Sequence, residues 1–220
     1  MDTTLATLVE EALNNCFLDS RIFTVFNLNG WGLRWPFGAD ENERFKLIRD
    51  YLRKTNYDFV LLQEVWYLSQ YELVKGTLPY ITDYQALNNG GCSGRFFIPL
   101  GCSGLVILSR HPIVFAEVQP FSVRGNFWNF DGEILVGKGI GRARVRLWNK
   151  YTVDLFTTHL VSYTNNPNRD NTWYRFLQSA QTAHAIKSSN ADIKIFGGDI
   201  NARPYLGNDG IMTNITNLYI

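Results

Sequence analysis

The sequence predicts a single mixed α/β domain, and three observations support this prediction. Segments with the apolar pattern of strands alternate with segments that have the apolar spacing of helices. The chain has 220 residues, of which 45% are hydrophobic and 19% charged, as in a globular protein with a sizeable core. No linker, internal repeat or low-complexity segment divides it, so we expect one domain over residues 1–220.

Four segments have the spacing of apolar residues that a helix requires. In residues 40–54 the apolar side chains recur on one face, and Asp40 stands where it can cap the first turn. The helix expected over residues 69–78 ends before Pro79, because proline cannot continue a helix. Two further helices are expected over residues 4–15 and 172–188.

Strands are expected where short apolar runs end in turn-forming residues. Residues 139–148 alternate apolar and basic side chains, as in a strand with one solvated face. The segment that begins at Ile193 has an apolar run followed by two glycines, which predicts a buried strand ending near Asp199. The other strands are expected at residues 21–27, 58–63, 103–110, 113–121 and 151–159, with a weaker one at 80–87.

Polar residues recur where four of these strands end: Asn27, Glu64, His159, and Asp199 with Asn201. Each has an ordinary explanation on its own, as a turn former, a carboxylate at a helix start or an interior histidine. Ligands of α/β proteins commonly bind at the carboxyl ends of strands, where an unbound polar group is costly to bury. The recurrence therefore favours one shared site.

The chemistry that suits this set is hydrolysis of a phosphate ester. Carboxylate and amide oxygens favour a hard cation such as Mg²⁺, and a single histidine without clustered cysteines disfavours zinc. Such an ion stabilises charge on phosphate oxygens, to which His159 and Asn201 can also hydrogen-bond, while Asp199 can orient water. The glycine-rich run 137–141 lacks the strand-then-helix context of a phosphate-binding loop.

Composition and cysteines restrict the partners and the compartment. A net charge of +1 gives no electrostatic case for nucleic acid as a partner. No run is apolar and long enough to span a membrane, and the N-terminus lacks the pattern of a secretory signal. Cys92 and Cys102 each lie in Gly-Cys-Ser-Gly and a hairpin can join them, but without a signal we expect reduced thiols. We therefore expect an intracellular protein, or a secreted one if the N-terminus is incomplete.

Five ordered motifs resemble those of the endonuclease/exonuclease/phosphatase superfamily. They are Phe26-Asn27, Gln63-Glu64, Ser103-Gly104 followed by Ser109-Arg110-His111-Pro112, Thr158-His159-Leu160, and Gly198-Asp199-Ile200-Asn201. Within the superfamily, the segments 27–32 and 62–66 with their tryptophans look like those of the neutral sphingomyelinases. The resemblance spans roughly residues 21–204.

This resemblance implies a four-layer α/β sandwich with two packed sheets and a Mg²⁺ site at one end, which Mn²⁺ can also fill. Glu64 would be the principal metal ligand, with Asn27 beside it. The substrate would be sphingomyelin, cleaved to ceramide and phosphocholine.

The resemblance also assigns catalytic and substrate-binding roles. His159 would contact the scissile phosphate, and Asp199 and Asn201 would position the attacking water and stabilise the transition state. Asn29 would join His159 and Asn201 in binding substrate.

One part of the family pattern has no counterpart. The family has a general-base histidine in an Asp-His pair near the end of the domain. Besides His159, this sequence has only His111, in the Ser-Arg-His-Pro motif, and His184, in an expected helix. We therefore expect a domain that is incomplete at its C-terminus, and we leave open whether the 220-residue chain is active.

Two alternatives remain at this stage. The chain can be another phosphoesterase of the superfamily, a nuclease or an inositol-phosphate phosphatase, or a catalytically incomplete lipid-binding fragment. For a sphingomyelinase we expect a peripheral protein on a phospholipid membrane surface. Trp31, Trp35, Phe127 and Trp128 would then seat at the interface, where tryptophan is favoured, although packing within the domain is the competing interpretation.

Overall fold

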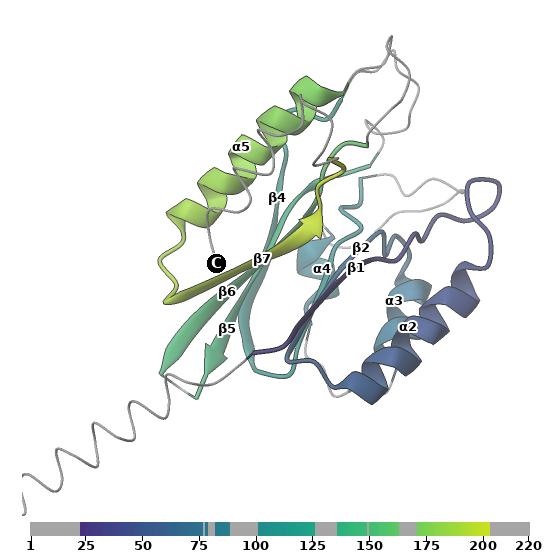
Figure 1. Cartoon of the computed structure of the whole chain (residues 1–220), viewed down its shortest axis with the longest axis horizontal. Coiled ribbons are helices and arrows are strands. Elements are labelled where there is room, and N and C mark those ends of the chain that lie inside the picture. Colours follow the sequence, from purple (N-terminus) through teal and green to yellow (C-terminus); the bar gives the residue numbers. More distant parts are fainter. Residues whose placement is uncertain are drawn as a thin grey trace, which may run out of the picture.

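Two β-sheets flanked by helices make up the computed structural model, which describes residues 23–76, 78, 82–88, 101–125, 136–148, 150–162 and 171–202 (Figure 1). In chain order the elements are β1 (Val25–Asn29), α2 (Glu41–Thr55), β2 (Phe59–Gln63), α3 (Leu68–Lys75), α4 (Tyr84–Leu87), β3 (Val106–Ser109), β4 (Ile113–Pro120), β5 (Gly139–Leu147), β6 (Tyr151–His159), α5 (Thr172–Ser188) and β7 (Ile193–Asp199).

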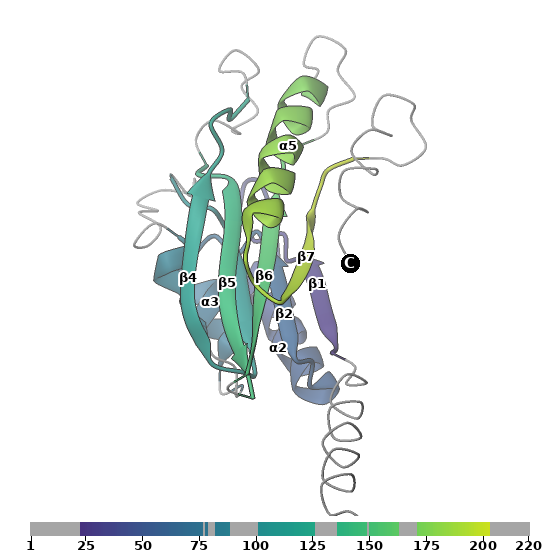
Figure 2. The ribbon, with the colours of Figure 1, turned by 90° about the vertical axis from the view of Figure 1, so that its left-hand side faces the viewer.

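The two sheets pack face to face (Figure 2). One has the strand order β1-β2-β3, with β1 parallel and β3 antiparallel to β2. The other has the order β4-β5-β6-β7, antiparallel except for the parallel β6–β7 pair. Strands β1 and β7 each form an edge of their sheet and lie side by side, so the carboxyl ends of both parallel pairs lie at one end of the molecule.

The alternation of side chains in the strands creates three apolar layers. In β2, Phe59 and Leu61 point between the sheets, whereas Val60 and Leu62 pack against α2 and α3. On the other sheet, Phe156 contacts α5. The order helix, sheet, sheet, helix is the predicted α/β sandwich, and the fold class is confirmed.

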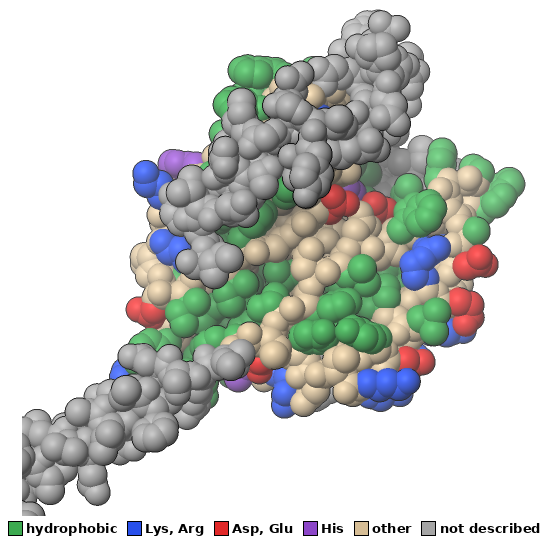
Figure 3. All heavy atoms as spheres, viewed as in Figure 1, with side chains coloured by type: hydrophobic (Ala, Val, Ile, Leu, Met, Phe, Trp, Pro, Cys, Tyr) green, Lys and Arg blue, Asp and Glu red, His purple; other side chains and the backbone are tan. Residues whose placement is uncertain are grey.

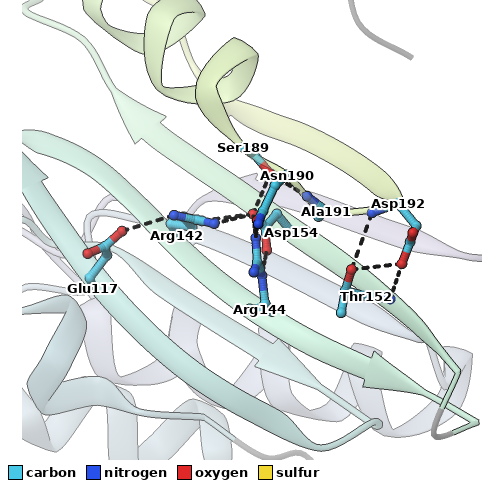
Figure 4. Close-up of polar contacts among 9 residues, drawn as sticks. All are labelled: Glu117, Arg142, Arg144, Thr152, Asp154, Ser189, Asn190, Ala191 and Asp192. Atoms are coloured by element: carbon cyan, nitrogen blue, oxygen red, sulfur yellow. Dashed lines mark hydrogen bonds and ion pairs between the residues drawn. The ribbon is translucent and has the colours of Figure 1, made fainter.

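A buried carboxylate ties the second sheet together at the end away from the strand termini just described (Figure 4). Asp154, on β6, is fully buried and accepts five hydrogen bonds, at 2.6–2.9 Å, from Arg142, Arg144 and Ser189. Burial alone would raise the pKa of Asp154, but the hydrogen bonds from these three residues outweigh it, and the pKa is lowered. The cluster joins β5, β6 and the connection between α5 and β7.

Several expected boundaries are corrected by the structure. Strand β1 continues to Asn29 because its pairing with β2 continues, so Asn27 lies inside the strand and not at its end. Residues 84–87, expected in a weak strand, form a helical turn in which Asp83 Oδ1 accepts a hydrogen bond from the Ala86 N–H. Asp40 precedes α2 in a left-handed conformation and makes no side-chain cap.

Strand β7 is half-buried along its whole length, because it is an edge strand, and the expectation of a buried strand is wrong. Cys102 is disulfide-bonded, so the expectation of reduced thiols is wrong for this residue. Its side chain is fully buried beside Trp66. Among the described helices, none is both long and apolar enough to cross a bilayer. The expectations for residues 4–15, Cys92, Phe127 and Trp128 also fall outside the described residues.

Replacing Asp154 with Asn removes the charge that pairs with Arg142 and Arg144. We expect the Asp154→Asn variant to lose about 3 kcal/mol of unfolding free energy at pH 7, measured by urea denaturation. Since the folded-state pKa of Asp154 is lowered, this stabilisation is present above the ordinary carboxyl pKa, about 4, and is lost as the pH falls through the lower folded-state pKa. The difference between the two proteins should therefore shrink in acid.

Glu117→Gln is the matched control, because Glu117 is a half-exposed partner of the same Arg142. We expect it to lose less than about 1 kcal/mol. Equal losses from the two variants would show that the buried carboxylate is not the centre of the cluster.

Candidate active site

The two parallel strand pairs bring four polar side chains to one end of the sandwich. In the first sheet, Asn29 ends β1 opposite Gln63, and Glu64 follows β2. In the second sheet, His159 ends β6 directly opposite Asp199, which ends β7. Because β1 and β7 lie side by side, residues from both sheets meet here, and Figure 3 shows acidic side chains between the end of β7 and the β1–α2 loop.

The amide of Asn29 joins the two carboxylates. Its Nδ2 donates to Glu64 Oε1 and to Asp199 Oδ2, each at 2.8 Å. Its Oδ1 accepts a hydrogen bond from the backbone N–H of Trp31 at 2.8 Å, which determines the orientation of the amide. The contacts thus hold two carboxylates from different sheets around one amide nitrogen.

His159 lies beside this pair and is buried. Its Nε2 is 4.0 Å from Glu64 Oε1, 3.8 Å from Asp199 Oδ2 and 3.4 Å from the Nζ of Lys138. Burial, and then the positive charge of Lys138, lower the pKa of His159 well below its usual value. The imidazole is therefore neutral near pH 7, and its buried Nδ1 has no hydrogen-bond partner among the described residues.

Lys138 is the residue that the sequence analysis missed. It is only 4% exposed, and its Nζ donates to the carbonyl oxygen of Leu160 at 2.9 Å. The flanking glycines do not form a phosphate loop. A Cβ at Gly137 would lie 2.2 Å from the Gly101 carbonyl oxygen, and one at Gly139 would lie 2.4 Å from that of Gln119. The sequence signal that could have identified Lys138 is a lysine between two glycines at the start of a buried strand.

Asn27 and Asn201 have other direct partners. Asn27 Oδ1 accepts a hydrogen bond from Gln63 Nε2 at 3.0 Å, and the same nitrogen donates to Thr157 Oγ1 at 2.9 Å. Asn201 lies in the turn after β7, where its Nδ2 donates to the Leu160 carbonyl oxygen at 2.9 Å. Its N–H donates to Asp199 Oδ1 at 3.0 Å, so Asp199 is held from both sides.

Three non-glycine residues at this end have left-handed backbone conformations: Trp31 with φ 45°, Glu64 with φ 58° and Asn201 with φ 49°. Such conformations are uncommon and cluster at functional sites, where the surrounding structure imposes them. Trp31 donates its N–H to Asn29, Glu64 carries one of the two carboxylates, and Asn201 donates its N–H to Asp199.

The donor set fits a magnesium ion. Among the described residues there is no group of three or more His, Cys, Asp and Glu side chains that could hold a metal. Mg²⁺ does not need such a group, because it keeps several waters and is usually held by one or two carboxylates. Glu64 and Asp199 supply two carboxylates within hydrogen-bond distance of the same nitrogen, and oxygen donors suit this ion.

Trp66 packs against the backbone of Gly104, in the Ser-Gly motif that the sequence analysis identified. The nitrogen of its indole lies 3.4 Å from Glu64 Oε2. A Cβ at Gly104 would lie 2.5 Å from the ring, and Gly104 has φ +69°. The absence of a side chain at Gly104 thus allows Trp66 to lie beside Glu64.

Comparison with protein families and curated proteins places this geometry in context. A model described as the endonuclease/exonuclease/phosphatase family matches residues 26–218. A Drosophila melanogaster protein named putative neutral sphingomyelinase is 29% identical over 183 residues, covering 82% of this chain and 39% of the relative. Inositol phosphosphingolipids phospholipase C of Schizosaccharomyces pombe is 26% identical over 185 residues, covering 82% and 41%. The chain thus spans well under half the length of these curated relatives.

Solved structures have the same fold. A mutant of Staphylococcus aureus beta toxin with bound magnesium ions matches with a TM-score of 0.70 and 18% identity, covering 91% of this chain and 72% of the toxin. D. rerio TDP2, complexed with a single-strand DNA product, matches with a TM-score of 0.61 and 21% identity, covering 88% and 64%. At these identities the likeness shows the fold alone.

The contact between Gly104 and Trp66 gives a prediction for stability. We expect Gly104→Ala to lose about 2 kcal/mol of unfolding free energy in urea denaturation, because its methyl group would displace the Trp66 ring. Gly101→Ala is the control, since Gly101 also has a positive φ, +75°, but a Cβ there has nothing within 4 Å. If both variants lost the same free energy, the backbone conformation and not the Trp66 contact would be responsible.

Proposed function

This chain belongs to the endonuclease/exonuclease/phosphatase family, and we propose that it is a Mg²⁺-dependent phosphodiesterase that hydrolyses sphingomyelin to ceramide and phosphocholine. The observation that carries the proposal is the Asn29 amide that holds Glu64 and Asp199 together beside His159. The relatives named as sphingomyelinases support the choice of substrate.

In this proposal Glu64 is the principal ligand of the ion, and Asp199 lies close enough to assist it. When bound, Mg²⁺ supplies positive charge that stabilises the developing charge on the phosphate oxygens. Asn29 keeps the two carboxylates in place, and its contact with Trp31 prevents the amide from turning over. Asn27, which the sequence analysis expected beside Glu64 as a ligand, stands two residues before Asn29 on β1, and its Oδ1 accepts a hydrogen bond from Gln63.

His159 and Lys138 contact the phosphate from the side of the second sheet. The neutral imidazole hydrogen-bonds a phosphate oxygen, while the ammonium group beside it provides a fixed positive charge in a buried environment. Asp199 and Asn201 orient the attacking water. The Asp199 carboxylate is fixed for this role by hydrogen bonds from the Asn29 amide and the Asn201 backbone.

Proton abstraction from the water needs a base other than the remaining histidines. His111 pairs with Asp58 at 3.6 Å, but Asp58 precedes β2 and Glu64 follows it, about 20 Å away along the strand. His184 is exposed on α5. We therefore propose that this chain binds metal and substrate, and that turnover without a further base is slower by about 10²–10⁴-fold.

Two other functions share the fold. The resemblance to TDP2 in complex with DNA fits a nuclease, although the net charge of +1 offers little attraction for a polyanion. The Schizosaccharomyces pombe relative is named for inositol phosphosphingolipids, which differ from sphingomyelin in the head group. A lipid-binding fragment without turnover is the third possibility.

We propose that the chain acts at a phospholipid membrane surface as a peripheral protein. Trp31 and Trp35, in the β1–α2 loop, are 54% and 73% exposed beside the site. The disulfide at Cys102 favours an oxidising compartment over the cytosol, so it supports the secreted alternative of the sequence analysis.

The test is release of phosphocholine from sphingomyelin vesicles by the 220-residue chain, in Mg²⁺ and then in EDTA. We expect slow release that depends on the metal. Glu64→Gln should lower it by about 100-fold or more, because the ion loses its principal ligand. Glu72→Gln, an exposed change of the same chemistry on α3, should leave it unchanged.

Parallel assays with inositol phosphorylceramide vesicles and with single-stranded DNA separate the alternatives. If the chain hydrolysed either of these substrates faster than sphingomyelin, that substrate would replace sphingomyelin in the proposed function. Release that is equal in wild type and Glu64→Gln would show that the carboxylate pair is not the reactive site.

A further inference from the structure

The exposed tryptophans of the described residues are unevenly distributed over the molecule. Trp31 and Trp35 follow β1, and Trp173, which is 64% exposed, lies in the first turn of α5. All three lie at the end of the sandwich that carries His159 and Asp199, because β1 ends there and α5 begins there. Only Trp148, which is 41% exposed and lies in the turn between β5 and β6, is at the opposite end.

Trp173 is connected to the site by two packing contacts. Its ring stacks on Phe176, with centroids 5.5 Å apart and an interplanar angle of 19°. Phe176 and Ile200 both pack against the buried apolar cluster that contains Leu160. Leu160 follows His159, and Ile200 lies between Asp199 and Asn201. The exposed Trp173 ring is therefore connected, through Phe176, to the ends of β6 and β7, which carry His159 and Asp199.

The first turns of α5 are held firmly, so Trp173 projects from a rigid support. Arg175, which is 1% exposed, donates to the Ser162 carbonyl oxygen at 3.1 Å. Gln178 Oε1 accepts a hydrogen bond from the Val161 N–H at 2.9 Å. A large apolar ring fixed in an exposed position indicates a contact surface.

The opposite side of the site has the same kind of surface. Figure 3 shows hydrophobic side chains gathered over the β1–α2 loop, where Trp31, Trp35 and Phe37 are each more than half exposed. The guanidinium of Arg44 lies 5.3 Å from the centre of the Trp31 ring and donates to the Trp31 carbonyl oxygen. Tryptophan beside arginine suits the head-group region of a bilayer, where rings are favoured and phosphates are available to the cation.

We propose that Trp173 is a second interfacial anchor, and that the chain docks on a sphingomyelin bilayer with the site between Trp173 and the β1–α2 loop. This inference rests on the proposed function, because that function places the phosphodiester at the depth of the lipid head groups. The carboxylates can reach it only if this end of the sandwich faces the bilayer. Trp173 and Trp31 then contact the surface on either side of the bound lipid.

The experiment is sedimentation of the 220-residue chain with sphingomyelin vesicles in EDTA, which measures binding without turnover. We expect Trp173→Ala to bind about tenfold more weakly, the factor that one large, partly buried apolar side chain supplies. Trp173→Phe should recover part of the affinity. Trp148→Ala is the matched control, because Trp148 is also exposed and stacks on a phenylalanine, Phe23, but lies at the far end of the molecule. This variant should bind the vesicles like wild type.

Activity toward a water-soluble phosphocholine ester, which forms no bilayer, separates this inference from the proposed function. Trp173→Ala should hydrolyse that ester like wild type and lose activity only on vesicles. Equal binding by wild type and Trp173→Ala, or equal losses from Trp173→Ala and Trp148→Ala, would overturn the anchor. Weaker vesicle binding by Trp173→Ala, with no hydrolysis by any variant, would overturn the proposed function and support the anchor.

Discussion

The hydrogen bonds of the Asn29 amide are the interaction on which the rest of the site depends. Two carboxylates from different sheets repel each other unless a donor or a cation lies between them. One amide nitrogen serves both, at 2.8 Å from each, and the backbone of Trp31 holds the amide oxygen. The same contacts therefore link the two sheets and set the carboxylates in place, and in the proposed function these carboxylate oxygens hold a hard cation.

This arrangement places strict demands on the strands that support it. His159 stands opposite Asp199 only in the observed register of β6 and β7, and a slip by one residue would turn one of them to the other face. The Asp154 cluster joins the opposite ends of the same elements, where the chain passes from α5 into β7. Close packing of Trp66 on Gly104 supports Glu64 in the first sheet. Rigid supports of this kind keep a site in its productive geometry.

Most of the framework could be predicted from the sequence, because period and turn residues determine it locally. Strand β6 and helix α5 have the expected bounds, and Glu64, His159 and Asp199 converge as their positions at strand ends indicate. Contacts between distant segments could not be predicted. Lys138 lies beside His159 between Gly137, which packs on the backbone of Gly101, and Gly139, which packs on that of Gln119 in β4. Asn29 takes the end of β1 only because pairing with β2 extends past Asn27.

The most direct test of the central claim is calorimetric titration of Mg²⁺ into the 220-residue chain and into its Asp199→Asn and Glu64→Gln variants. If the carboxylates joined by Asn29 form the metal site, wild type will bind Mg²⁺ at a single saturable site. Glu64→Gln will abolish this binding, and Asp199→Asn will weaken it. Binding that is the same in all three proteins, or no binding in wild type, would contradict the account.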